Sequence, residues 1–128
     1  MSSVASMIEI LPGLPDDVVG AEGVGEVEAR DYETVLIPAV ESALADNDRI
    51  RLLYVLGDRF DGISGGAAWE DAKLGIEHLR AWERMAVVTD VEWIGHALRA
   101  VGWMIPAEIR VFRTSQRQAA EDWITGSD

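Results

Sequence analysis

Residues 60–90 read FDGISGGAAWEDAKLGIEHLRAWERMAVVTD, and this stretch decides the fold. It begins with a glycine-rich turn, continues as a helix rich in small residues and tryptophan, and ends in a buried strand. A nearly continuous apolar strand at residues 50–56 comes directly before it. Strand, turn, helix and strand in this order form the crossover unit of a parallel sheet. The stretch therefore predicts an α/β fold.

The apolar spacing extends this prediction to both ends of the chain. The predicted strands cover residues 7–11, 18–24, 50–56, 85–89 and 109–112. The predicted helices cover residues 31–45, 64–82, 90–105 and 115–125. The order ββαβαβαβα predicts one α/β domain with a mixed five-stranded sheet, an antiparallel strand at its N-terminal end and helices packed on it. We expect residues 7–125 to form this domain, between a flexible N-terminus at 1–6 and a C-terminal tail at 126–128.

Local signals set the ends of the predicted helices. Pro38 removes a backbone donor within the first helix and predicts a kink there. Thr89 with Glu92 has the spacing of a capping box, and Ser115 with Gln118 has the spacing of a second one. Both pairs predict a helix start close to the end of a strand.

Composition and charge exclude several classes of protein. The chain has 128 residues, a net charge of −12 and no cysteine, so it has no disulfide and no thiolate chemistry. Residues 1–48 hold eleven carboxylates and one base, Arg30, and such a field repels nucleic acid and anionic membranes. No apolar run approaches the roughly 20 residues that a membrane-spanning helix needs. We expect a cytoplasmic protein that binds no nucleic acid and is not integral to a membrane.

Several segments of the chain resemble one known family. They are WEDAKLG at 69–75, ERMAVVTD at 83–90 with Trp93 after it, DYE at 31–33, EIRVF at 108–112, and the ending with Ala120, Trp123 and Ile124. Together they resemble the SpoIIAA-like family over about residues 7–125. The resemblance implies a fold similar to STAS domains and to CRAL-TRIO (Sec14-type) lipid-binding domains, and with it the binding of a lipid or another hydrophobic ligand. The family often has threonine before its first helix, where this chain has Ala29.

Ser64 lies in the sequence GISGG, which matches the G-x-S-x-G motif of serine hydrolases. A hydrolase needs this serine on a tight strand-to-helix turn with a histidine within reach, but Ser64 follows the strand by eight residues. His78 and His96 both lie on predicted helices, whereas hydrolases carry this histidine on a loop. A helix-capping serine explains the motif better.

The resemblance to STAS-type anti-sigma-factor antagonists implies a second role for Ser64. In those proteins a serine at this helix start is phosphorylated, and the free amides of a helix N-terminus favour the added charge. Asp61, Glu70 and Asp71 oppose it here, because they repel a phosphate. A phosphoswitch at Ser64 remains an alternative.

Metal and cofactor chemistry has little support in the sequence. Asp58 and Asp90 follow two central strands, at the edge where ligands of α/β sheets bind, and paired carboxylates suit Mg²⁺. However, phosphoryl chemistry also needs a nearby lysine or a phosphate-binding loop. Lys73 is the sole lysine and lies within a predicted helix, and the sequence shows no phosphate-binding loop beside the two aspartates. Asp90 is better explained as a first-turn residue beside Thr89. We expect no metal and no cofactor.

The five tryptophans carry the strongest functional signal. On the predicted helix 90–105, a core stripe is accompanied by a second stripe that contains Trp93, His96, Ala100 and Trp103. A homodimer interface, an apolar ligand pocket and contact with a partner protein all explain the second stripe, and so does coverage by neighbouring elements. The core stripe is Ile94, Ala97, Leu98, Val101 and Ile105.

These observations favour a binding module over an enzyme. We expect a non-catalytic protein that takes a lipid-like or other hydrophobic ligand, or a protein partner. The hypothetical site residues are Phe60, Trp69, Trp93, His96 and Trp103. Trp69 and Trp82 are expected in or at the edge of the core, and Trp123 is expected to pack the last helix on the sheet. No catalytic residue is assigned.

Overall fold

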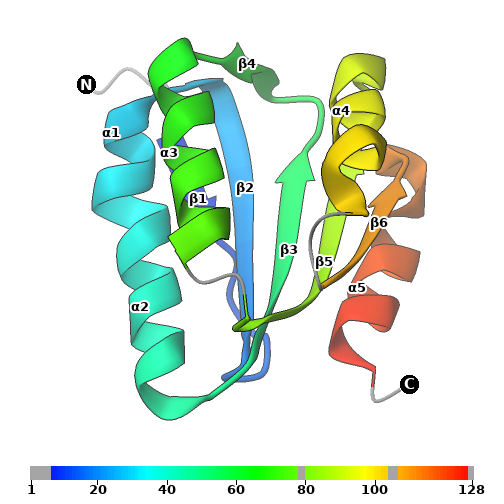
Figure 1. Ribbon diagram of the computed structural model, residues 1–128. Coiled ribbons are helices and arrows are strands. Elements are labelled where there is room, and N and C mark those ends of the chain that lie inside the picture. The colour runs from blue at the N-terminus through cyan, green and yellow to red at the C-terminus, as the bar shows by residue number, and fades with distance from the viewer. Residues whose placement is uncertain (1–6, 78–79, 104–106, 127–128) are drawn as a thin grey trace.

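The computed structural model describes residues 7–77, 80–103 and 107–126, and shows one sheet with helices on both faces (Figure 1). The strands are β1 (Met7–Ile10), β2 (Val18–Val27), β3 (Ile50–Leu56), β4 (Phe60–Ile63), β5 (Trp82–Thr89) and β6 (Glu108–Phe112). The helices are α1 (Ala29–Asp31), the π-helical turn η1 (Tyr32–Leu36), α2 (Ile37–Asp46), α3 (Gly65–Glu77), α4 (Glu92–Gly102), the 3₁₀ turn η2 (Thr114–Gln116) and α5 (Arg117–Thr125).

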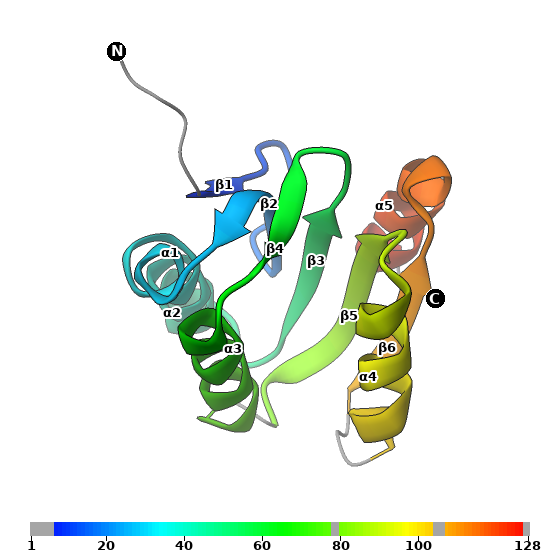
Figure 2. The same ribbon diagram turned by 90° about the horizontal axis from the view of Figure 1, so that it is seen from above.

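The sheet has the strand order β1-β2-β3-β5-β6, and β4 pairs with the end of β2 beside this path. β1 runs antiparallel to β2, whereas β2, β3, β5 and β6 are mutually parallel. Each crossover moves the chain one position in the same direction, so right-handed connections place α2, α3 and α4 on the same face. α5 follows the last strand and lies on the opposite face, as Figure 2 shows. The predicted mixed α/β sheet is confirmed.

Alternation along the central strands divides the core between the two faces. On the face that carries α2, α3 and α4, Leu52, Tyr54 and Val87 belong to the larger cluster of buried side chains. On the other face, Leu53 and Ala86 pack against α5 in a smaller cluster. Trp123 joins that cluster at its edge, which confirms its predicted role, and Phe112 lies beside its ring. Trp82 is 1% exposed, in agreement with its predicted core position.

The sequence predicted five strands, and the structure adds a sixth. β4 lies in the glycine-rich segment that was predicted as a turn at the start of the stretch 60–90, and its register partners are Gly25–Val27 of β2. Gly62 has a φ of 139°, a backbone conformation that favours glycine. Four residues with a central aspartate and glycine show too little alternation to predict a strand.

The first helix begins two residues earlier than predicted. The Glu28 amide donates to the Asp31 carboxylate at 2.8 Å, so this pair closes the helix start in place of a threonine cap. The π-helical turn directly precedes the turn that contains Pro38. The predicted disturbance of the helix is therefore a widened turn on the N-terminal side of the proline.

Both predicted capping boxes are wrong in detail. α4 begins at Glu92, and the Thr89 hydroxyl accepts a hydrogen bond from the Val91 amide at 3.1 Å, two residues on rather than three. At the last helix, the Gln116 side chain accepts from the Arg113 amide at 3.0 Å, and Ser115 lies inside the 3₁₀ turn. The spacing identified the regions but not the capping residues.

Some predictions fall on other parts of the chain. The flexible N-terminus at 1–6, residues 78–79 of the predicted helix 64–82, the helix stop at 104–106 and the tail residues 127–128 lie outside the described residues. The predicted end of that helix at Trp82 is wrong, because Trp82 begins β5.

Candidate functional site

The predicted site residues do not form one pocket. Trp69, Trp93 and Trp103 are 66%, 59% and 81% exposed, His96 is exposed, and Phe60 is half-buried. Trp93 and Trp103 lie at opposite ends of α4, about 15 Å apart along its axis. Trp69 lies on α3, and its predicted position in the core is wrong. The aromatic groups therefore belong to separate parts of one face.

The second stripe on α4 is left uncovered by the described residues. Trp93, His96, Ala100 and Trp103 are all exposed, so coverage by neighbouring elements does not explain the stripe. The opposite side of the helix carries buried Ile94 and half-buried Leu98, while Ala97, predicted in the core stripe, is exposed. The side chain of Val101 and residue Ile105, which complete the predicted stripe, lie outside the described part of the structure.

Ser64 caps α3. Its hydroxyl oxygen accepts a hydrogen bond from the Ala67 amide at 3.1 Å, and its own amide donates to the Val27 carbonyl at 2.9 Å. The serine therefore joins the end of β2 to the start of the helix, as the capping explanation predicted. Of the two histidines considered as its base, His78 lies outside the described residues and His96 is on α4.

Asp90 ties the end of β5 to the start of η2. Its carboxylate accepts from the Thr114 amide at 3.0 Å and from the Thr114 hydroxyl at 2.6 Å, and these bonds lower its pKa. The predicted first-turn role beside Thr89 is thus replaced by a contact between two loops. Asp58 lines a hollow of about 260 Å³ at the same edge, and Thr114 lines it too. Within residues 7–77, 80–103 and 107–126, no three potential metal ligands gather in one place.

A buried glutamate, Glu22, lines that hollow and pairs with its two arginines. Glu22 is 9% exposed and lies directly opposite Glu9 in the β1–β2 register. Arg59 contacts both carboxylates, at 3.1 Å from Glu22 and 2.9 Å from Glu9, and Arg117 lies 3.8 Å from Glu22. Two like charges across strands repel, and the shared guanidinium offsets this repulsion. The paired side chains of Glu22, Arg59 and Arg117 therefore line the hollow, and we assign them a structural role.

The sequence prediction missed a hydrogen-bonded chain of Tyr54, Tyr32 and Asp71. The two tyrosine hydroxyls are 2.9 Å apart, and the Tyr32 hydroxyl donates to Asp71 Oδ1 at 3.0 Å. Because Tyr32 has a single hydroxyl hydrogen, Tyr54 must donate to Tyr32 while Asp71 is ionised. Both rings are buried and meet edge to face. A tyrosine within the apolar strand at 50–56 was the available signal, since a buried hydroxyl requires a partner.

The ionisation of this chain is shifted toward its neutral forms. Burial raises the pKa of Tyr32 and of Tyr54, and the negative charge of Asp71 raises both further. Burial also raises the pKa of the Asp71 carboxyl, partly opposed by the hydrogen bond from Tyr32. Asp71 as a residue nevertheless remains exposed to solvent.

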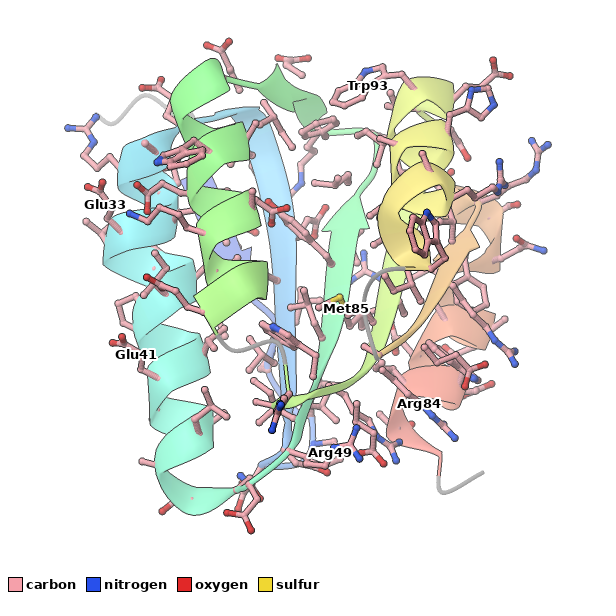
Figure 3. All side chains as sticks on the ribbon, in the orientation of Figure 1. Glu33, Glu41, Arg49, Arg84, Met85 and Trp93 are labelled. Carbon is pink, nitrogen blue, oxygen red and sulfur yellow. The ribbon has the colours of Figure 1, made fainter. Side chains whose placement is uncertain are left out.

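Asp71 lies on α3, and its carboxylate meets the Tyr32 hydroxyl of η1. The helices α3 and α4 stand apart on this face of the sheet, with β3 and β5 between them (Figures 1 and 2). Figure 3 shows Met85 on β5 between these helices, and Trp93 extending from the start of α4 toward β4. We call the part of the sheet between α3 and α4, where Met85 is half-buried, the interhelical surface.

The comparisons with known proteins agree with this architecture. The SpoIIAA-like family model matches residues 18–125 of the chain. A crystal structure from Shewanella loihica PV-4, of an uncharacterized DUF3478-family protein with a SpoIIAA-like fold, is 33% identical to this chain. It has a TM-score of 0.76 and covers 97% of this chain and 98% of its own. No curated protein matches. Among the described residues, no helix has the length and apolar character needed to cross a bilayer.

Proposed function

Since this chain belongs to the SpoIIAA-like family, we propose that it is a non-catalytic binding module whose interhelical surface takes an amphipathic small molecule. The observation that carries the proposal is Asp71 on α3, a solvent-exposed residue whose carboxylate accepts a hydrogen bond from the buried Tyr32 hydroxyl at 3.0 Å. Such a site offers apolar area and one polar anchor, which is the usual composition of a small-molecule pocket.

The charges around the site narrow the class of ligand. A carboxylate at the anchor accepts hydrogen bonds and attracts a cation, but repels an anion. The net charge of −12 adds to this repulsion, and Glu33 and Glu41 lie on the outer side of η1 and α2 (Figure 3). The ligand is therefore a neutral or cationic amphiphile with a hydroxyl or amine head, and anionic lipids bind poorly.

The polar anchor is held in place by the tyrosine chain. Tyr32 comes from the helical segment after β2, Tyr54 from β3 and Asp71 from α3. Hydrogen bonds between these three elements hold the carboxylate in place, so the Asp71 side chain loses less conformational freedom when a ligand binds. Trp93, near β4, supplies aromatic area at the end of the site where the parallel strands finish.

Three probes with the same twelve-carbon tail test this proposal: dodecylamine, dodecanol and dodecanoate, titrated below their micelle concentrations by tryptophan fluorescence and calorimetry. We expect the amine and the alcohol to bind more tightly than the carboxylate. Asp71→Asn is expected to reduce the charge preference between amine and carboxylate, and the net charge of the chain leaves a weaker, general preference. Asp122→Asn, on α5 at the opposite face, makes the same chemical change and leaves the preference intact. If none of the probes binds, or if Asp71→Asn leaves the preference unchanged, the proposed site is wrong.

A phosphoswitch at Ser64 is the alternative function. Its support is weaker because the Ser64 hydroxyl already accepts the Ala67 amide, and Asp61 lies three residues before it. If this alternative holds, Ser64→Asp changes the binding of a partner protein while probe binding at the interhelical surface stays the same.

A further inference from the structure

β6 is an open edge of the sheet. It pairs with β5 on one side, and within the described residues no strand pairs with its other side. Figure 2 shows α4 and α5 on the two faces near this edge, without a further strand beyond it. An edge strand presents unpaired amides and carbonyls that can pair with another strand. β6 is therefore able to extend the sheet by one more partner.

The side chains of β6 are complementary to a second copy of themselves. Glu108 and Arg110 form an ion pair at 3.1 Å within the strand, and both side chains are 53% exposed. If two β6 strands meet antiparallel around Ile109, Glu108 of each copy lies directly opposite Arg110 of the other. A shift that centres the pair on Arg110 instead places two arginines opposite each other, which is unfavourable. The charge pattern thus favours one register of self-pairing.

A hollow with apolar side chains and two arginines in its lining, Arg99 and Arg110, lies beside the same edge. It has a volume of about 440 Å³ and is lined by the C-terminal half of α4 and by β6, including Leu98, Trp103, Ile109 and Val111. Trp103 is 81% exposed at this position, and Arg99 also lines the hollow. Tryptophan and arginine are enriched in protein interfaces relative to the rest of the surface. A second copy at this edge brings two such hollows together on one face of the joined sheet.

The other edge of the sheet is less suited to self-pairing. β1 has four residues, and its one charged side chain, Glu9, is held by Arg59. Two β1 strands in an antiparallel pair gain no opposite charges from one another. Of the two edges, as far as the structure describes them, β6 alone carries a complementary charge pair and adjoins a hollow lined by Trp103.

We propose that the chain forms a two-fold symmetric dimer in which β6 pairs antiparallel with β6 of a second copy, centred on Ile109. The two sheets become one continuous sheet, and the contact is the same patch on both copies. Two intermolecular Glu108–Arg110 pairs replace the two pairs within the strands. Trp103 and the hollow form the contact on the α4 face.

Charge reversal tests this dimer by analytical ultracentrifugation at low salt. Wild-type protein is expected to be dimeric at about 100 μM, and to dissociate as salt is added. Glu108→Arg and Arg110→Glu each place like charges opposite each other, and each should raise the dissociation constant by about tenfold or more. A mixture of the two variants pairs opposite charges again and is expected to restore dimers that contain one copy of each.

The mixing result separates this contact from a folding defect, since an unfolded variant is not rescued by its counterpart. Circular dichroism of each variant provides the direct check, and both residues are exposed at an edge, so the fold should persist. Trp103→Ala is expected to weaken the dimer without altering charge. A monomeric wild type, a dimer that both single reversals leave intact, or a mixture that fails to pair would each overturn the proposal.

Discussion

The hydroxyl groups of Tyr32 and Tyr54 meet 2.9 Å apart beneath α3, where the Tyr32 hydroxyl continues to the Asp71 carboxylate at 3.0 Å. The three residues come from three different elements and are separated by 22 and 39 positions along the chain. This contact joins the helical layer to the sheet and positions the carboxylate that we propose as the ligand anchor.

Removal of the central hydroxyl should cost more than removal of the terminal one. Tyr32→Phe leaves both the Tyr54 hydroxyl and the Asp71 carboxylate without their partner, and we expect a loss of about 1–3 kcal/mol in unfolding free energy. Tyr54→Phe preserves the bond between Tyr32 and Asp71 and should cost about 1 kcal/mol. Urea unfolding of both variants measures the difference. Equal losses would contradict the order of the chain.

Asp71 should make folding stability depend on pH. Burial raises its pKa in the folded state, so the folded protein holds this proton more tightly than the unfolded chain does. The contribution of Asp71 is therefore favourable at acidic pH and is lost as the pH rises through the raised pKa. Asp71→Asn carries no ionising group and lacks this dependence.

The measurement is the unfolding free energy of wild type and Asp71→Asn at several pH values from about 4 to 8. The variant should gain stability relative to wild type as the pH increases. Asp122→Asn on α5 is the matched control and should show no such trend. A constant difference between wild type and Asp71→Asn would show that the carboxyl ionises as it does in water.

Arg51 should stabilise the docking of α5 on the sheet. Its guanidinium donates to the Ile124 carbonyl at 2.9 Å and to the Gly126 carbonyl, and it pairs with Glu83 at 3.1 Å. Cations at a helix C-terminus complement its dipole and free carbonyls. We expect Arg51→Met to cost about 1–3 kcal/mol in thermal or urea unfolding. Arg30→Met, an exposed residue with the same loss of charge, is the control and should cost little.

The same arginine sets the acid response of Glu83. The hydrogen bond from Arg51 lowers the pKa of Glu83 in the folded state, so this contribution is present above the ordinary glutamate pKa and is lost as the pH falls through the lowered value. In Arg51→Met that acid-dependent part should become smaller, because Arg49 and Arg84 still lower the pKa of Glu83. An unchanged acid limb of the stability curve would contradict the role of this pair.

The two exposed tryptophans of α4 should separate ligand binding from dimerisation. Trp93 extends toward β4 at the end of the interhelical surface, whereas Trp103 lines the hollow beside β6. Trp93→Ala should weaken dodecylamine binding and leave the dimer unchanged. Trp103→Ala should weaken the dimer and leave dodecylamine binding unchanged. Calorimetry measures dodecylamine binding and sedimentation measures dimerisation for each variant. If either variant loses both properties, ligand binding and dimerisation do not use separate surfaces.

The sequence predicted the order of the strands and helices because hydrophobic periodicity is a local property. The apolar strands at 50–56 and 85–89, with the helix between them, were read in the correct order. The sixth strand was missed because β4 depends on its partner β2, through Gly25–Val27, rather than on its own alternation. The capping box predicted for Thr89 and Glu92 does not form. The loop after β5 is held by a bond between Asp90 and Thr114, and Thr114 lies too far along the chain for a local pattern to include it.

The candidate site was predicted less well for the same reason. Helical spacing identified the second stripe on α4, but it did not show that Trp93 and Trp103 serve two separate surfaces. Trp69 has the spacing of a core residue, yet α3 packs mainly against α1 and η1 and leaves this ring in solvent.

By itself, the sequence determined the α/β class, the family and the acidic charge that disfavours anionic partners. Each of these follows from composition or from residues close together along the chain. Only the tertiary structure brought Asp71 to the buried hydroxyl of Tyr32 and left β6 at the edge of the sheet. Those relations arise from strand order and helix packing, which join residues that no short sequence pattern connects.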